Sequence, residues 1–407
     1  MGKTIVLVGR LDSKGAEYGY VKERIARSGL DVIVVDVGTR GLPLFTAEIP
    51  REEVAQAAGM AMDDLVDRAD ENKEIQVMMK GAAVIAKRLL DSGRLDGLMA
   101  LGGSRGTAIG TAAMRVLPFG IPKLMVSSIA SGDMRPYVAT KDIMVIHSVT
   151  DILGLNRMTR QLLANAAAAI AGAVERGSVT ETSNKTVIAL SSMGGLNRAV
   201  FGVQKALEGR GYEIVAFHAV GTGGRAMEET IGQGLVNGVL DLATHELTDH
   251  LHGGYYDAGE ARLETAGARG IPQVVVPGCT DFIAFSPPDR IPERMKGRKV
   301  FMHTPEVAII RANRTEMETV GEAMASKLNK AIGSTSVLIP LRGFSPGNRE
   351  GKALYDPEAD QGFIRALKQN IKPSIRLVEV DAHINDTAFV EQAVELVEEA
   401  LGGGHSS

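Results

Sequence analysis

Two glycine-rich segments of this 407-residue chain contain the residue types that bind anions. The first, Gly102-Gly103-Ser104-Arg105-Gly106-Thr107, follows an apolar run and precedes a helix-like stretch. Glycines let the backbone approach a ligand, and the free amides of a first helical turn attract an anion. The Ser104 and Thr107 hydroxyls and the Arg105 guanidinium add donors for a phosphate or a carboxylate. The alternative is a tight turn that needs glycine only for packing.

The second segment, Gly221-Thr222-Gly223-Gly224-Arg225, repeats the same ingredients. The first segment is neither a Walker A loop nor the GxGxxG dinucleotide fingerprint. Asp36 stands where a Rossmann-like unit often holds a ribose, but the turn after the first predicted strand, residues 9–15, is not GxGxxG either, so we do not expect dinucleotide binding. Further candidates for ligand contact follow other predicted strands: Gly9, Ser131, Gly132, Met193, Gly194 and Gly195.

Two histidines follow predicted strands and are candidates for proton transfer. His218 ends a strand just before the second glycine-rich segment, and His383 follows the last predicted strand. Either imidazole could act as a general acid or base. For His383 the alternative is a role in capping the final helix, together with Asn385 or Asp386.

One histidine-rich segment has a spacing that could suit a metal ion. His245, Asp249 and His252 lie four and three residues apart, so a helix would place them on one face. This pattern is not the HExxH zinc motif and no further ligand can be assigned, so we expect a solvated helix and no metal site. Cys279 has no assignable histidine partner, so a buried structural thiol is expected rather than a nucleophile.

The composition narrows the class of protein. The chain has 45 Lys and Arg against 49 Asp and Glu, so it lacks the basic excess typical of nucleic-acid-binding domains. It has no Trp and few aromatic residues, which favours helices packed on parallel strands of Val, Ile and Leu. A single Cys forms no internal disulfide, and no apolar run reaches the roughly 18 residues that span a bilayer. We expect a cytoplasmic protein with no nucleic-acid or membrane partner.

Strand-like and helix-like patterns alternate along the whole chain. Apolar, β-branched runs predict strands at residues 4–8, 31–37, 97–101, 123–127, 143–147, 186–190, 212–218, 238–242, 273–276, 299–303, 336–339 and 376–380. Most of the intervening segments have helical character, including residues 14–28, 51–70 and 73–90. This alternation predicts an α/β protein with two doubly wound, mostly parallel, Rossmann-like domains facing an interdomain cleft. We place the domains at residues 1–180 and 186–401, the polar linker at 177–185 and a flexible tail at 402–407.

Several segments, taken together and in order, resemble the Tm-one-like ATP-binding family. They are VLVGRLDSKGAEYGYV, ALGGSRGTA, VSSIASGDMRPYV, FHAVGTGGRAMEE, DLATHELTD, PGCTDFIAFSPPD, LIPLRGFSP and VDAHIND. The family is similar to the amino-terminal half of a tomato tobamovirus-resistance protein, and it has no established reaction. The resemblance implies two Rossmann-like subdomains, ATP binding, a homodimer and a TIM-barrel partner protein.

The resemblance also carries residue by residue onto the glycine-rich segments. It implies ligand-loop roles for six residues: Gly102, Gly103, Ser104, Gly221, Gly223 and Gly224. Arg105 replaces a glycine of the family pattern, and His245 stands where a threonine is usual. The arginine either adds an anion contact or obstructs the loop.

Three hypotheses about function remain open from the sequence. The first is an ATP-binding protein, with Mg²⁺ where phosphates are bound, whose ligand lies in the interdomain cleft. Its use as an enzyme would require a metal-binding carboxylate, for which Asp133, Asp241 and Asp281 are candidates. The second is a hydrolase or lyase that acts on a small anionic carboxylate, with His218 or His383 as base. The third is a non-catalytic interaction protein that is gated by nucleotide.

Overall fold

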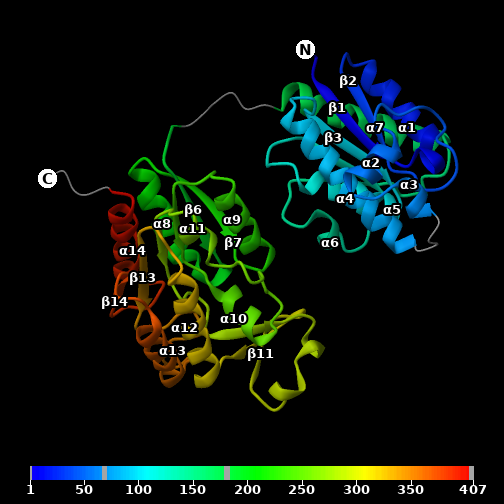
Figure 1. Cartoon of the computed structure of the whole chain (residues 1–407). Coiled ribbons are helices and arrows are strands. Elements are labelled where there is room, and N and C mark those ends of the chain that lie inside the picture. The colour runs from blue at the N-terminus through cyan, green and yellow to red at the C-terminus, as the bar shows by residue number, and fades with distance from the viewer. Residues whose placement is uncertain (1, 67–70, 178–183, 403–407) are drawn as a thin grey trace. The chain divides into compact units, whose positions relative to one another are not determined.

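The structure is a computed structural model that describes residues 2–66, 71–177 and 184–402 (Figure 1). The chain divides into two compact units, Met1–Thr182 and Ser183–Ser407, each with its own parallel sheet and hydrophobic core. Most of the predicted linker and of the predicted tail lies outside the described residues. No helix of the described segments has the length and apolar character needed to cross a bilayer.

The N-terminal unit is built on a five-stranded parallel sheet in the order β2-β1-β3-β4-β5. Its strands are β1 (Thr4–Gly9), β2 (Asp31–Asp36), β3 (Gly97–Gly102), β4 (Lys123–Ser127) and β5 (Met144–His147). Its helices are α1 (Leu11–Ala26), α2 (Arg51–Ala57), α3 (Met62–Val66), α4 (Glu71–Asp91), α5 (Ser104–Arg115), α6 (Arg135–Val138) and α7 (Arg157–Arg176).

Helices cover both faces of this sheet. Successive strand residues point to opposite faces, so Ile5 and Leu7 pack in the core with α1 and α7. Val6 and Val8 pack in the other core, with α2, α4 and α5. The prediction of a doubly wound α/β unit is confirmed. The prediction of one continuous helix over residues 51–70 is wrong. The segment contains two helices, α2 and α3, because Gly59 adopts φ +88° and ends the first of them.

The C-terminal unit has a six-stranded parallel sheet in the order β14-β13-β9-β8-β6-β7. Its strands are β6 (Val187–Ser192), β7 (Glu213–His218), β8 (Gly238–Asp241), β9 (Gln273–Val275), β13 (Thr335–Pro340) and β14 (Arg376–Val380). Its α-helices are α8 (Asn197–Gly209), α9 (Thr222–Gly232), α10 (His245–His252), α11 (Thr265–Ala268), α12 (Arg314–Leu328), α13 (Pro357–Asn370) and α14 (Thr387–Ala400). Three 3₁₀ turns are η1 (Gly194–Leu196), η2 (Pro288–Arg290) and η3 (Glu293–Met295).

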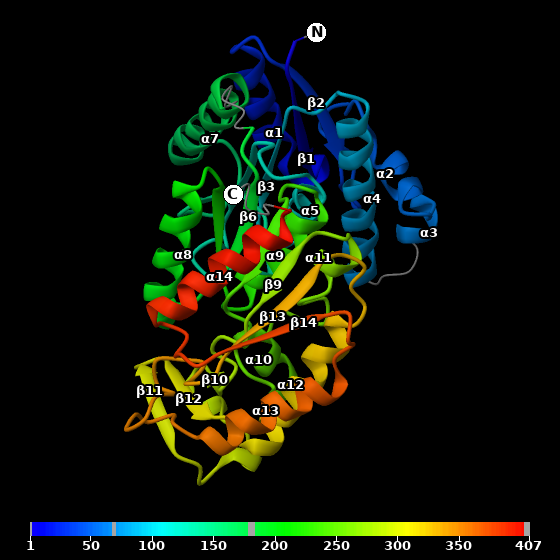
Figure 2. The ribbon, with the colours of Figure 1, turned by 90° about the vertical axis from the view of Figure 1, so that its left-hand side faces the viewer.

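The two sheets share one strand order. Read from the second strand of each unit, β7-β6-β8-β9-β13 repeats the order β2-β1-β3-β4-β5, and β14 is one strand more. Helices α8 and α14 lie side by side on one face of the second sheet (Figure 2), while α12 and α13 pack in a core on the other. Each unit is therefore a doubly wound α/β sheet of the same topology.

A small antiparallel sheet interrupts the C-terminal unit between β9 and β13. It consists of β10 (Phe282–Phe285), β11 (Val300–Thr304) and β12 (Val307–Arg311), in the order β10-β12-β11. The sequence predicted only a strand at residues 299–303 here and missed the other two. Ile283 and Ile310 pair across this sheet and belong to the core that contains α12 and α13.

Candidate functional site

The first glycine-rich segment lies where the strand order of the N-terminal sheet reverses. Strand β1 has β2 on one side and β3 on the other, and ligands of doubly wound sheets bind at the carboxyl ends of such strands. Gly103 precedes α5, and no described side chain caps this helix. Gly102 has φ +156°, and a Cβ there would lie 3.0 Å from Gly106 Cα. The loop therefore needs its glycine and presents the first amides of α5.

Arg105, on the same loop, is half exposed and pairs with a carboxylate of α4. Its guanidinium contacts Glu71, which also pairs with Arg40 at 3.1 Å. Arg105 and Arg10 line one small cavity. Both arginines have a carboxylate partner, because Arg105 pairs with Glu71 and Arg10 lies 3.4 Å from Asp12.

Two predicted ligand residues of this unit, Thr107 and Asp36, have hydrogen-bond partners inside the fold. The Thr107 hydroxyl contacts Gly103 O at 2.8 Å and Ser127 Oγ at 2.7 Å. Asp36 Oδ1 accepts hydrogen bonds from Leu11 N at 3.0 Å and Gly38 N at 2.9 Å, and burial raises the pKa of this carboxyl. These contacts explain both side chains structurally, and their contact with a ligand stays a prediction.

Gly9 also has a packing explanation. A Cβ at Gly9 would lie 1.9 Å from the ring of Tyr18, whose hydroxyl donates to Val8 O at 2.6 Å. In the loop after β4, Ser131 and Gly132 are exposed, and Gly132 N donates to Ile129 O at 3.0 Å.

The second glycine-rich segment already holds an anion, and that anion belongs to the chain. Glu246 Oε1 accepts hydrogen bonds from Gly221 N at 2.6 Å and from Gly224 N at 3.0 Å. A Cβ at Gly224 would lie 1.9 Å from Glu246 Oε2, and one at Gly223 would lie 1.7 Å from His218 O. Two amides of this segment therefore bind an internal carboxylate, and contact of the segment with a ligand stays a prediction. Thr222 and Arg225 lie in the first turn of α9.

Glu246 belongs to a buried network around Arg262. Arg262 Nε donates to Glu246 Oε2 at 2.7 Å, and its terminal nitrogens contact both oxygens of Asp241 and Glu228 Oε1. Burial alone would lower the pKa of Arg262, but these carboxylates raise it well above its usual value. The guanidinium therefore stays charged. Asp241, a candidate metal ligand, is committed to this network.

The other two candidate metal-binding aspartates also have internal partners. Exposed Asp133 pairs with Arg135 at 2.8 Å. Asp281 is fully buried, and its Oδ2 accepts a hydrogen bond from Ser345 Oγ at 2.7 Å. Burial raises the pKa of the Asp281 carboxyl. Neither contact involves the glycine-rich loops.

The segment with possible metal ligands forms α10, but its side chains diverge. His245 Nδ1 donates to Cys279 O at 2.7 Å, and its Nε2 lies 3.2 Å from Asp249 Oδ2. His252 turns instead towards Glu316 O at 3.3 Å. Burial lowers the pKa of His245, but nearby Asp249 outweighs it and the net shift is upward. Among residues 2–66, 71–177 and 184–402, no three His, Cys, Asp or Glu side chains are placed to hold a metal ion. The helix is buried here, not solvated as expected.

His383 has both ring nitrogens in hydrogen bonds with the backbone. Its Nε2 donates to Ser345 O at 2.9 Å, and its Nδ1 accepts from Asn385 N at 3.1 Å. Burial lowers the pKa of His383, which favours the neutral ring. Asn385 in turn accepts from Ala199 N at 3.2 Å, so it caps α8 rather than the final helix. His383 thus has structural contacts but not the helix-capping role considered from the sequence, and its role as a general acid or base stays a prediction.

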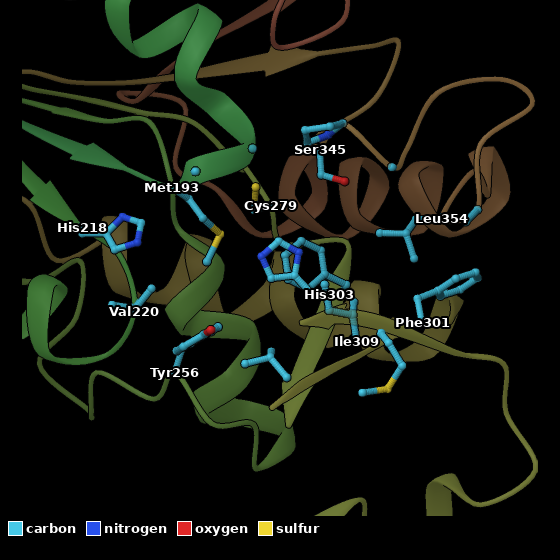
Figure 3. Close-up of a pocket in the computed structure, with 18 residues that line it drawn as sticks. Met193, His218, Val220, Tyr256, Cys279, Phe301, His303, Ile309, Ser345 and Leu354 are labelled. Atoms are coloured by element: carbon cyan, nitrogen blue, oxygen red, sulfur yellow. The ribbon is translucent and has the colours of Figure 1, made fainter. Parts of the chain in front are cut away.

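A cavity of about 410 Å³ brings several predicted residues together in the C-terminal unit (Figure 3). The carboxyl ends of the parallel strands contribute Met193, Gly194, Gly195, His218, Cys279 and Ser345. The small antiparallel sheet contributes Phe301, Met302, His303, Val307 and Ile309. Sequence reasoning missed His303, which lies on an exposed strand and in no recognisable motif.

Cys279 is the buried thiol of this cavity. It is 1% exposed, and burial raises the pKa of its thiol well above the usual value. Its backbone has φ +61°, a left-handed conformation that is strained for a residue with a side chain. The thiol is therefore protonated at neutral pH, which agrees with the structural role expected for it.

Comparison with known proteins places both units in one family. Residues 3–178 match "Uncharacterised protein family (UPF0261) N-terminal domain", and residues 185–401 match the C-terminal domain of that family. A UPF0261 protein of Clostridium tetani is 41% identical over 390 residues and covers 96% of each chain. One from Rhizobium meliloti is 38% identical over 394 residues, covering 96% of this chain and 98% of that protein.

The relationship expected with a tomato resistance protein is also found. The ToMV resistance protein Tm-1(GCR237) of Solanum lycopersicum is 32% identical over 414 residues, which are 96% of this chain and 55% of that protein. A solved UDP-GlcNAc 2-epimerase from Methanocaldococcus jannaschii aligns over 98% of this chain and 92% of its own, with 10% identity and a TM-score of 0.21. That score is too low to support an argument about function. The chain belongs to the UPF0261 family.

Proposed function

We propose that this protein binds a nucleotide, ATP with Mg²⁺, and that the loop Gly102-Gly103-Ser104-Arg105 holds its phosphates. One observation carries the proposal: the N-terminus of the 12-residue helix α5 is uncapped where the strand order reverses. Free amides and the helix dipole favour an anion at such a point. The resemblance to an ATP-binding family supplies the choice of ATP. It also suggests a homodimer and a TIM-barrel partner, which we include in the proposal.

The second glycine-rich segment supports this interpretation by contrast. There the same residue types bind the carboxylate of Glu246 through two amides. In the first segment, no carboxylate of the described residues accepts a hydrogen bond from the amides of Gly103, Ser104 or Arg105. A loop type that this chain uses to bind an internal anion is therefore left open for an external one.

The test is calorimetric titration of ATP, with and without MgCl₂, into wild type, Gly103→Val and Gly172→Val. Gly103 has φ −81° and ψ −157°, and a Cβ there would lie 3.5 Å from Ser128 Oγ, so the valine fits but covers the amides. Gly172, on α7, has open space around its Cβ position and serves as the control.

We expect wild type and the control to bind ATP equally and Gly103→Val to lose about tenfold or more in affinity, since charge-assisted bonds to phosphate would be lost. If wild type does not bind ATP, the proposal that ATP is the ligand is refuted. If Gly103→Val binds ATP as tightly as wild type, the assignment of the phosphates to this loop is refuted.

A second candidate function is a hydrolase or lyase that acts on a small carboxylate. The observation that favours it is the cavity, which places His218 with the amide-bearing residues Gly194 and Gly195. In this proposal His218 is the general base and the amides bind the carboxylate. Turnover of a small carboxylate that is lost in His218→Ala would support this function. Turnover that survives the substitution would oppose the role of His218 as base. Absence of any turnover would favour the nucleotide-gated interaction protein.

A further inference from the structure

We propose that the cavity of the C-terminal unit binds a small apolar monocarboxylate. Its hydrocarbon part would lie against the antiparallel sheet, and its carboxylate would lie at Gly194 and Gly195. The inference rests on the second candidate function and names the substrate class of that site. It is independent of the nucleotide proposed for the N-terminal unit.

The residues that line the cavity limit the charge of the ligand. Among the described residues that line the cavity there is no Lys, Arg, Asp or Glu. A polyphosphate or a tricarboxylate needs several cationic partners when it is taken out of water. A molecule with at most one negative charge is the anion that this lining can accept.

The same residues indicate that most of the ligand is apolar. Most of the side chains are apolar or aromatic, and the wall includes Phe301, Met302, Ile309 and Leu354. Figure 3 shows Phe301, Ile309 and Leu354 on one side of the cavity, across from His218 and Val220. Pockets of several hundred Å³ with such walls and a few polar groups typically bind small organic molecules. The volume of about 410 Å³ lies in that range.

The polar end of the cavity is formed by main-chain amides at the start of α8. Turn η1 runs directly into this 13-residue helix, so the amides of Gly194 and Gly195 share the positive end of its dipole. No described residue accepts a hydrogen bond from either amide. Asn385 Nδ2 donates to Gly195 O at 3.0 Å and fixes this peptide.

Two imidazoles complete the polar groups. His218 ends β7, and His303 lies on β11, so they reach the cavity from different sheets (Figure 3). Both side chains are exposed and can donate a hydrogen bond to one carboxylate oxygen. Main-chain amides and imidazole N–H donors suit a single carboxylate, which matches a ligand that is mainly hydrocarbon.

The experiment measures binding of phenylacetate to the full chain by calorimetry and ligand-observed NMR. The comparison ligands are phenylacetamide, which lacks the charge, acetate, which lacks the ring, and citrate, which has three carboxylates. We expect phenylacetate to bind at least about tenfold more tightly than each of them, as expected when both the charge and the apolar surface contribute. Equal affinity for phenylacetamide or acetate, or a preference for citrate, overturns the proposal.

Variants locate the site. Gly194→Val should weaken phenylacetate binding about tenfold or more, because its branched side chain covers the amide, and Cβ there has open space. Gly209→Val, with open space at the other end of α8, is the matched control. Met302→Asp changes an exposed residue of the apolar wall and should also weaken binding. Unchanged affinity in both Gly194→Val and Met302→Asp overturns the assignment to this cavity.

The binding assay tests this inference separately from the hydrolase or lyase function on which it rests. Phenylacetate binding is measured without turnover. If phenylacetate binds and no carboxylate is turned over, the hydrolase or lyase function fails and the ligand class stands. If phenylacetate does not bind, the ligand class fails whatever the result of the turnover or ATP experiments.

Discussion

Replacing Arg262 with methionine should destabilise the C-terminal unit strongly. Arg262 is 1% exposed and is the shared partner of Asp241, Glu246 and Glu228, which are 3%, 0% and 8% exposed. Methionine has a similar length but no charge and no donors. The substitution would leave buried carboxylates without their cation, and Glu246 would keep only the two loop amides.

The size of the effect follows from the burial of the network. Removing one partner of a buried ion pair costs about 3–5 kcal/mol. For a unit of this size about 1 kcal/mol shifts the melting temperature by roughly 2–4 °C, so a loss of about 6–20 °C is expected. Burial raises the pKa of Glu246 and Arg262 counteracts this, so without the guanidinium the pKa of Glu246 rises further in the folded variant. The folded variant then binds more protons than the unfolded chain, so its deficit is largest above neutral pH and shrinks as the pH falls.

The loss of stability is measured by thermal and urea unfolding, monitored by far-UV circular dichroism because the chain has no Trp for fluorescence. The control is Arg314→Met, which removes a pair with Glu318 whose arginine is 60% exposed. The control should unfold like wild type, because exposed pairs contribute little. The reasoning is refuted if Arg262→Met is as stable as the control at pH 7, or if its deficit grows in acid.

Three further predictions test other parts of the structure. Gly9→Ala should abolish the stable N-terminal unit, because its Cβ would lie 1.9 Å from the buried Tyr18 ring, whereas Gly172→Ala, in open space, should melt no lower than wild type by circular dichroism. Burial raises the pKa of Asp360 from 3.8 to about 7, so the folded state keeps a proton that the unfolded chain releases. Wild-type stability should therefore fall as the pH rises from about 4 to about 7, and urea melts of Asp360→Asn should show a weaker slope; equal slopes would contradict this. Cys279 should react with iodoacetamide at pH 8 at least about tenfold faster in urea than in the native state, because a buried neutral thiol is a poor nucleophile; equal rates in mass spectra would exclude its burial.

Local sequence was sufficient where a strand is buried on both faces. The runs at β1, β3 and β4 have continuously apolar centres, so the sequence predicts the bounds of these strands to within one residue. The start of α1 was predicted three residues late, because the amide of Leu11 is satisfied by Asp36, 25 residues along the chain. Strands β10 and β12 were missed because each is short and gains its stability from pairing with the other.

The candidate sites show the same division between local and tertiary information. Met193, Gly194, Gly195 and His218 could be predicted to converge, since parallel strands end at one edge of a sheet. The two glycine-rich segments have the same local ingredients, and only the position of Glu246 on α10 distinguishes them. The opposite wall of the cavity could not be predicted, because it depends on the antiparallel sheet.

The cavity wall and the polar groups of the C-terminal unit come from different parts of the chain. Residues 282–311 supply one wall of the cavity but no strand of the parallel sheet. The groups suited to bond making and breaking, His218 and the amides at Gly194 and Gly195, are supplied by the parallel scaffold. Substitutions within this one segment would therefore change the preference for the proposed ligand, while His218 and the two amides keep their positions. Transplanting it between relatives should transfer ligand preference as a module.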